Sequence, residues 1–309
     1  MQPLRLGMTS LDLREVRVRG RALWILDEGA AAGLYGGNKV RKLAYLLAEA
    51  VGSGATDVLT FGAVGSHHVL ATALHGGALG LRTHAVFIAQ PDHPHVRAQA
   101  ARSVAALASW DVADPVATLP AATARVTARV LAETGRLPFV VPPGGSSVTG
   151  TMGWVRAGRA LGEALGPEIE VVVASGSGGT AAGLWAGGCR VRAVRVGPRT
   201  LTHRARLLRL GRGAAYAWSG PCDLPSAARL TIDGSYLGGG YGVVDARTAR
   251  ALRWGHDLGL PMEPTYTAKA LAAAWDRAAV GPVCFVQSAS SVAPPVPAHP
   301  LPPALEQLL

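Results

Sequence analysis

The stretch Tyr35-Gly36-Gly37-Asn38-Lys39-Val40-Arg41-Lys42-Leu43 combines a glycine turn with the rarest charged residue of this chain. Lysine occurs three times in 309 residues, at positions 39, 42 and 269, so arginine supplies nearly all of the positive charge. A guanidinium stays protonated and cannot form a Schiff base, whereas a lysine amine can. The pattern therefore favours a primary amine with a chemical role. The alternative is a pair of solvated lysines on an ordinary first helical turn.

Composition describes a well-packed globular protein with room for two lobes or one large α/β domain. Of its residues, 49% are hydrophobic and 16% are charged. The cysteines, Cys189, Cys222 and Cys284, are odd in number and widely spaced, which suits a reducing compartment and neither a disulfide framework nor a zinc site. Residues 1–10 do not resemble a secretory signal, and every apolar run is interrupted before it reaches a membrane-spanning length. We expect a cytoplasmic protein with no membrane partner.

The formal charge of +10 invites a nucleic-acid interpretation. The arginines, however, are scattered singly, without a basic run or a basic-aromatic module, so we expect no nucleic-acid partner. The neighbouring His67 and His68 would point in different directions at a helix start, and we therefore predict no metal site.

Strands and helices alternate along the chain, which predicts βαβ units and parallel sheets. Two short strands with a turn at Gly20 are predicted within residues 11–28. Further strands are predicted over 57–61, 84–88, 138–141, 169–174, 191–196 and 283–287, and helices over 43–50, 69–79, 94–108, 120–134, 150–165, 181–186, 245–258 and 267–278. We expect residues 200–240 to be irregular, residues 293–303 to be extended, and a lobe boundary near residues 142–147.

A glycine-rich loop, Ser175-Gly176-Ser177-Gly178-Gly179-Thr180, joins the strand at 169–174 to the helix that follows. Unpaired N–H groups and the helix dipole converge there, and glycine lets a phosphate approach closely. The spacing fits a dinucleotide fingerprint poorly, and no Gly-Lys-Ser/Thr follows as in a P-loop. A single phosphate site together with an imine-forming lysine points to pyridoxal 5′-phosphate.

Gly-Gly-Asn-Lys-Val-Arg-Lys-Leu at 36–43 resembles the GGNKxRKLEYL signature of the D-cysteine desulfhydrase and 1-aminocyclopropane-1-carboxylate (ACC) deaminase family. These are pyridoxal phosphate enzymes of the tryptophan synthase β-like fold, also called fold type II. Further segments keep the family's order from about residue 24 to residue 291: 62–68, 143–146, 175–180, 241–242 and 263–269. The resemblance implies a two-lobed α/β protein in which each lobe has a mainly parallel sheet flanked by helices. It places a large cofactor domain at residues 1–43 and 149–309 and a small domain at residues 44–148.

The resemblance also assigns roles to single residues. Lys39 would carry the cofactor as a Schiff base and shuttle the α-proton, while the like charge of Lys42 would lower the pKa of Lys39. Ser66 corresponds to a catalytic serine that contacts the substrate carboxylate or acts as a nucleophile or base. The remaining candidates are Tyr241 and Tyr266 as active-site tyrosines, and Asn38, Lys42, His67, Ser175, Gly176, Ser177, Gly178, Gly179, Thr180 and Ser288 as cofactor-binding residues, with Ser288 at the pyridine nitrogen.

The chain departs from the family pattern near the cofactor. His67 replaces an asparagine that meets the ring hydroxyl, and Gly65 replaces a glutamine. The C-terminal H-T-G-G motif reads Gln287-Ser288-Ala289-Ser290, and Asp27-Glu28 lacks the preceding Lys-Arg. These changes leave the substrate open.

The resemblance implies α,β-elimination on a small amino acid such as D-cysteine or a β-substituted alanine, by a homodimer. ACC deaminase is the nearest rival, but that activity accompanies a Glu and a Leu where this chain has Thr267 and Ser288. β-Replacement and racemisation would use the same chemistry. A different class is a non-catalytic module that keeps the fold for binding, and the presence of Lys39, Ser66 and Thr180 argues against it.

Overall fold

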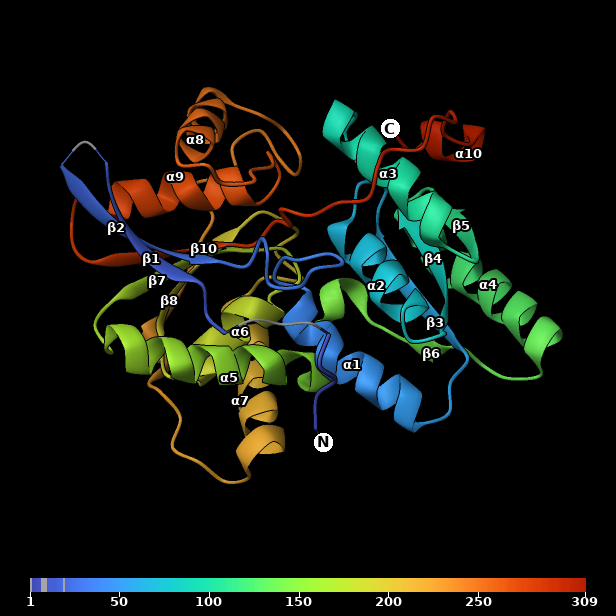
Figure 1. Ribbon diagram of the computed structural model, residues 1–309, viewed down its shortest axis with the longest axis horizontal. Helices are drawn as coiled ribbons and strands as arrows, with labels where there is room; N and C mark the ends of the chain where they lie inside the picture. Colours follow the sequence, from blue (N-terminus) through green and yellow to red (C-terminus); the bar gives the residue numbers. More distant parts are fainter. Residues whose placement is uncertain (1, 7–9, 19) are drawn as a thin grey trace. The chain divides into compact units, whose positions relative to one another are not determined.

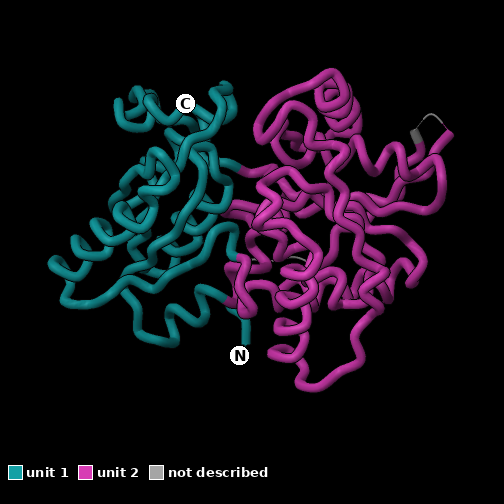
Figure 2. Tube along the Cα trace, turned by 180° about the vertical axis from the view of Figure 1, so that it is seen from behind, with its two compact units in different colours: residues 1–4, 46–145, 293–309 teal, residues 5–45, 146–292 magenta. Residues whose placement is uncertain are grey.

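The computed structural model describes residues 2–6, 10–18 and 20–309, so part of the expectation about residues 1–10 lies outside the described residues. The chain forms two compact units (Figure 1, Figure 2). Unit 1 comprises residues 1–4, 46–145 and 293–309, and unit 2 comprises residues 5–45 and 146–292. Both units are built from parallel strands and helices, and this confirms the α/β prediction.

Unit 2 contains a six-stranded sheet with the order β1-β2-β10-β7-β8-β9. Its strands are β1 (Leu13–Val18), β2 (Arg21–Asp27), β7 (Glu170–Ser175), β8 (Arg190–Arg195), β9 (Leu230–Asp233) and β10 (Val283–Gln287). The β1–β2 hairpin is antiparallel, and the other pairs are parallel. Strand β10 lies between β2 and β7, so it joins the N-terminal hairpin to the strand that leads into the glycine-rich loop.

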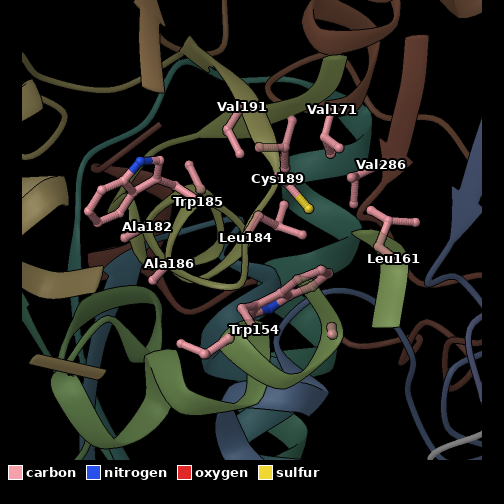
Figure 3. Close-up of a cluster of buried hydrophobic side chains, with 14 of the residues drawn as sticks. Trp154, Leu161, Val171, Ala182, Leu184, Trp185, Ala186, Cys189, Val191 and Val286 are labelled. Atoms are coloured by element: carbon pink, nitrogen blue, oxygen red, sulfur yellow. The ribbon is translucent and has the colours of Figure 1, made fainter. Parts of the chain in front are cut away.

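Helices cover both faces of this sheet because its strands are apolar on both sides. Along β7, Val171 and Val173 face the cluster formed with α5 (Val148–Leu165), α6 (Gly179–Ala186) and α7 (Arg204–Ser219). Trp154 and Trp185 lie in that cluster (Figure 3). Val172 and Ala174 face the opposite cluster, which includes α8 (Ala246–Asp257) and α9 (Thr267–Arg277).

Unit 1 contains a parallel four-stranded sheet with the order β5-β4-β3-β6. The strands are β3 (Asp57–Ala63), β4 (Arg82–Ile88), β5 (Ser109–Ala113) and β6 (Phe139–Val140). One face packs against α2 (His67–Gly77), α3 (Pro94–Ala106) and α10 (Pro303–Glu306), and the other packs against α4 (Leu119–Thr134). Helix α1 (Val40–Gly52) begins in unit 2 and continues into unit 1, and short 3-10 turns occur at Val116–Thr118, Pro143–Gly145 and Ala227–Arg229.

The prediction that residues 200–240 are irregular is wrong. They contain the 16-residue helix α7 and the strand β9. Leu207, Gly211, Ala214 and Ala215 are buried at helical spacing, but frequent arginines and glycines weaken that pattern in the sequence. Strand β5 was also not predicted, because its residues are mostly half-buried and include a polar Asp111. The other predicted strands and helices are present with small shifts at their ends.

Candidate active site

The Gly36–Lys39 segment of unit 2 lies between the ends of β2 and β10. Gly37 N donates to Glu28 O at 2.6 Å, and Asn38 N donates to Ser288 O at 3.2 Å. A Cβ added at Gly36 would come within 1.9 Å of Gly29 O, and Gly37 has φ +87°, so both positions require glycine. The glycine pair therefore lets the backbone before Lys39 approach both strand ends.

A buried ion pair anchors the start of α1 behind this segment. Both carboxylate oxygens of Glu28 accept hydrogen bonds from Arg41, at 2.7 to 2.9 Å. Burial raises the pKa of Glu28, although Arg41 opposes that shift. Trp154 Nε1 donates to Asn38 O at 2.9 Å, so the backbone on either side of Lys39 is held.

The Lys39 amine is joined to the glycine-rich loop by a short chain of hydrogen bonds. Lys39 Nζ donates to Asn38 Oδ1 at 2.6 Å, and Asn38 Nδ2 donates to Thr180 Oγ1 at 3.0 Å. Burial lowers the pKa of Lys39 from 10.5 to about 8, and the negative charge of Glu263 limits the shift. An appreciable fraction of this amine is therefore uncharged near neutral pH, as an imine-forming lysine or a general base requires.

The glycine-rich loop presents a set of donors around Ser146. Lys42 Nζ and Gly179 N each donate to Ser146 Oγ at 3.1 Å, and Ser146 Oγ lies 2.7 Å from Ser177 Oγ. Arg206 Nη1 donates to Ser177 O at 2.7 Å. Helix α6 begins at Gly179, so its N–H groups and the positive end of its dipole face the same place. A Cβ at Gly179 would lie 2.6 Å from Ser146 Oγ and would fill this cradle.

The charges of the cradle suit a phosphate. Burial, followed by the charges of Lys39 and Arg206, lowers the pKa of Lys42 well below 10.5. A dianion placed among a lysine amine, hydroxyl groups and helix N–H groups would reverse that shift, because opposite charge favours the ammonium form. The residues present thus fit a phosphorylated cofactor that also reacts with Lys39.

Tyr241 and Tyr266 form a hydrogen-bonded pair in unit 2. Their hydroxyl oxygens lie 2.8 Å apart, and the rings meet edge to face. Burial raises the pKa of Tyr241 to about 12 and raises that of Tyr266 well above 10, so both phenols stay protonated at neutral pH. A Cβ at Gly176 would lie 3.0 Å from the Tyr266 ring, which places this tyrosine beside the glycine-rich loop.

Two buried charges hold the tyrosines. Glu263 accepts from the backbone N of Thr265, Tyr266 and Thr267 at 2.6 to 2.8 Å and so fixes the start of α9. Lys269 Nζ, in the first turn of α9, donates to Leu237 O and Gly240 O at 2.7 Å each. Since Gly240 precedes Tyr241, Lys269 ties the loop of one tyrosine to the helix that follows the other.

Ser66 and His67 belong to unit 1. Ser66 is the N-cap of α2, and its Oγ accepts from Val69 N at 3.4 Å. His67 Nε2 lies 2.9 Å from His95 Nε2, and His67 Nδ1 lies 3.2 Å from Gln99 Nε2. Both ring nitrogens of His67 are therefore engaged within unit 1. A hydrogen bond from either nitrogen to a cofactor would require one of these contacts to break.

Unit 2 alone brings Asn38, Lys39, Lys42, the glycine-rich loop and both tyrosines into one connected network, with the Ser288 carbonyl against Asn38. The resemblance covers Ser146, Glu263 and Lys269 in its segments 143–146 and 263–269 but assigned none of them a role, and sequence reasoning did not identify Arg206. Ser146 follows the Pro-Gly-Gly turn that the resemblance had singled out, which was the available signal. Within the described residues, no three His, Cys, Asp or Glu side chains are grouped to hold a metal ion.

A parallel sheet whose strand ends carry a phosphate cradle and a reactive lysine defines a class of enzyme that uses a phosphorylated aldehyde cofactor. A family profile described as "Pyridoxal-phosphate dependent enzyme" matches residues 5–282. The chain belongs to this family, and its cofactor is pyridoxal phosphate.

Individual relatives agree with this assignment. D-cysteine desulfhydrase from Salmonella choleraesuis (strain SC-B67) is 29% identical over 302 residues, which cover 89% of this chain and 88% of the relative. The crystal structure of an ACC deaminase homologue is 29% identical with a TM-score of 0.78, over 93% of this chain and 91% of the other. O-acetylserine dependent cystathionine beta-synthase from Helicobacter pylori, 15% identical, has the same fold with a TM-score of 0.60, over 92% and 94% of the two chains. The predicted fold type II architecture is confirmed.

Proposed function

We propose that this enzyme catalyses α,β-elimination on a small amino acid with a leaving group at Cβ, with D-cysteine as the leading substrate. The products are pyruvate, ammonia and hydrogen sulfide, and one water is consumed when the released enamine hydrolyses. Relatives named D-cysteine desulfhydrase, alike over most of both chains, support this choice. When bound, the cofactor supplies an electron sink that acidifies the α-carbon of an amino acid joined to it.

Lys39 is the base in this proposal. Its pKa of about 8 leaves enough free amine near neutral pH to remove the α-proton, and Asn38 Oδ1, 2.6 Å from Nζ, orients it. The phosphate of the cofactor would be held by the Gly179 N–H and by four side chains: Lys42, Ser146, Ser177 and Thr180. The Ser288 carbonyl accepts from Asn38 N, and we expect Ser288 to lie beside the pyridine ring of the cofactor.

The tyrosine pair supplies a hydrogen-bond donor. One hydroxyl donates to the other across 2.8 Å, which leaves one O–H free to point at the substrate. Because both phenols have raised pKa values, that O–H stays protonated at neutral pH and is available to hydrogen-bond a departing thiolate. Ser66 is proposed to contact the substrate carboxylate.

One observation carries the proposal: a lysine amine of lowered pKa is linked through Asn38 and Thr180 to an anion cradle. The environment of Thr267 weighs against ACC as the substrate. Its side chain is buried and exchanges hydrogen bonds with the backbone of Glu263, so it serves the start of α9.

The test compares the wild type with Lys39→Ala and Lys39→Arg, each incubated with pyridoxal phosphate. We expect the wild type to show the visible band of a lysine-bound cofactor, to retain the cofactor after borohydride reduction, and to release pyruvate and sulfide from D-cysteine. Both variants should lose the reducible linkage, since neither side chain can form it. A reduced peptide that maps to another lysine would contradict the assignment of Lys39.

Offering D-cysteine, L-cysteine and ACC in turn then separates the possible substrates. Release of 2-oxobutanoate from ACC, with D-cysteine untouched, would replace desulfhydration by ACC deamination. A wild type that binds the cofactor but turns over none of the three would refute elimination on these substrates.

We further propose that the enzyme works as a homodimer in the cytoplasm. The family resemblance supports the dimer, and the three free cysteines suit a reducing compartment. Among the described residues, no helix has the length and apolarity needed to cross a bilayer. Light scattering coupled to size exclusion should give twice the chain mass, and a single chain mass would contradict the dimer.

A further inference from the structure

The C-terminal segment 293–309, which we call the tail, packs in unit 1 against the strand end that leads to Ser66. Leu301, Leu305 and Leu308 are buried in one cluster with Val64 and Val96. A Cβ added at Gly65 would lie 3.0 Å from Val96 atoms, so α3 also presses on this loop. The tail therefore packs its leucines in the same apolar cluster as Val64, which lies within the loop of residues 63–67.

A first chain of hydrogen bonds runs from the tail to Gly65. Gln90 N donates to Leu308 O at 3.0 Å, and Gln90 Oε1 accepts from Gly65 N at 3.2 Å. Gln90 is 5% exposed, so the loop amide has a fixed partner inside the protein. Gly65 is the residue directly before Ser66.

A second chain runs from the tail to His67. Arg102 Nε donates to Pro294 O at 2.7 Å, and Arg102 Nη1 donates to Gln99 Oε1 at 3.0 Å. Because arginine can only donate, the Gln99 carbonyl must face Arg102 and its NH₂ group must face His67. Gln99 Nε2 therefore donates to His67 Nδ1, 3.2 Å away.

This order of donors fixes the proton of His67. With Nδ1 acting as an acceptor, the ring proton lies on Nε2, which then donates to His95 Nε2 at 2.9 Å. The opposite order would place a protonated Nδ1 against the Gln99 NH₂ group. A carbonyl of the tail thus selects one neutral tautomer of the histidine next to Ser66.

We propose that the tail positions the Ser66–His67 loop for catalysis, with Gln90, Gln99 and Arg102 as the positioning residues. The importance of Ser66 in this inference rests on the proposed function, whereas the order of the loop and the tautomer of His67 do not. The proposal also bears on two departures from the family pattern, because the two chains of hydrogen bonds end at Gly65 and His67.

Arg102→Met tests the second chain, and Arg97→Met is its matched control. Both arginines lie on α3 and contact the tail. Arg97, however, forms ion pairs with Asp92 and Glu306 at the surface, and these pairs do not connect the tail to residues 62–68. Amide hydrogen exchange of residues 62–68 is measured in the full-length, cofactor-loaded protein. We expect exchange to accelerate roughly fivefold or more in Arg102→Met, as for the loss of about one hydrogen bond, and to stay unchanged in Arg97→Met.

The second readout is nitrogen NMR of ¹⁵N-histidine-labelled protein, with the His67 signals assigned from a His67→Asn variant. The wild type should show His67 protonated on Nε2, and Arg102→Met should show a mixture of tautomers. For D-cysteine, kcat should fall more than KM rises, because the loop is displaced while the cofactor cradle stays intact. Gln90→Met, which removes only the acceptor for Gly65 N, repeats the exchange test if Arg102→Met does not fold.

Equal exchange in Arg102→Met and Arg97→Met, together with an unchanged His67 tautomer, would overturn the proposal. So would a Gln90→Met protein whose 62–68 exchange matches the wild type. If D-cysteine proves not to be a substrate, the exchange and tautomer readouts still decide, so this failure is distinguishable from failure of the proposed function.

Discussion

At the scale of single residues, the three lysines have three different tasks. Lys39 has an amine of lowered pKa, Lys42 donates to Ser146 in the cradle, and Lys269 donates to two backbone carbonyls. Their scarcity in the sequence singled out the first two. The task of Lys269 could not be predicted in the same way, because its acceptors are the backbone carbonyls of Leu237 and Gly240. Every residue has a backbone carbonyl, so the residue types at these positions do not indicate the contact.

The lowered pKa of Lys39 makes a prediction about stability in the cofactor-free protein. An unfolded lysine binds its proton up to about pH 10.5, whereas folded Lys39 releases it near pH 8. The unfolded state therefore binds more protons between these values, and stability contributed by this group rises with pH across the window. Relative to Lys39→Met, the wild type should gain about 3 kcal/mol between pH 7 and pH 10.5.

Urea unfolding of the wild type and Lys39→Met at several pH values measures this difference. A gain confined to the window from pH 8 to 10.5 is the expected result. Two curves that stay parallel over the whole range would mean that Lys39 keeps an ordinary pKa in the folded protein.

At the scale of elements, glycine sets how closely α7 approaches α6. A Cβ at Gly211 would lie 2.6 Å from Ala182 O and 2.9 Å from the Trp185 ring. Gly211→Ala should therefore destabilise the protein by about 1–3 kcal/mol through overpacking. Gly162, in the last turn of α5, has no atom within 4 Å of an added Cβ, so Gly162→Ala should stabilise by about 0.5–1 kcal/mol. Chemical denaturation of both variants checks the opposite signs, and equal effects would contradict the packing argument.

The same glycine explains why α7 escaped prediction. In the sequence, Gly211 only lowers the helix propensity of its segment. Its value for the close contact between α7 and α6 becomes visible only in the structure. Helices with clear caps or clear apolar spacing, such as α1, α5 and α9, were predictable because their signals are local. Strand β5 carries no such signal, since its place is given by pairing with β4.

Lys269→Met tests the link between α9 and the Tyr241 loop. Losing a charged donor shared by two half-buried carbonyls should cost about 2–3 kcal/mol of unfolding free energy and lower kcat. Lys269→Gln keeps an amide donor and should lose less of both. Denaturant unfolding and D-cysteine turnover measure the pair, and a Lys269→Met enzyme with wild-type kcat would show that the tyrosines are placed without this lysine.

At the scale of the whole molecule, cofactor binding and folding are linked. Pyridoxal phosphate at a hundredfold excess over its Kd should raise the free energy of unfolding by about 2.7 kcal/mol. Pyridoxal, which lacks the phosphate, should stabilise far less at the same concentration because the cradle around Lys42 and Gly179 recognises the anion. Thermal unfolding of the cofactor-free protein with each compound checks this prediction. Equal stabilisation by the two compounds would mean that the cradle does not bind the phosphate.

The fold class could be predicted because family motifs spread over most of the chain fix the order of most elements, although α7, β9 and β5 were missed. The same motifs select the lysine, the glycine-rich loop and the tyrosines as site residues, and these assignments stay predictions. The contacts of the tail were not predicted, because its leucines and backbone carbonyls find partners far earlier in the chain, such as Gln90 and Arg102. Contacts of that kind have no period or spacing in the sequence.

The position of β10 has a consequence for biosynthesis. During translation, the β1–β2 hairpin and the β7–β8–β9 set are made long before the strand that lies between them. Until residues 283–287 emerge from the ribosome, β2 and β7 present unpaired edges to the surroundings. From the completion of β9 until β10 appears, the nascent chain therefore carries two incomplete sheets, and chaperone dependence should be greatest in that interval.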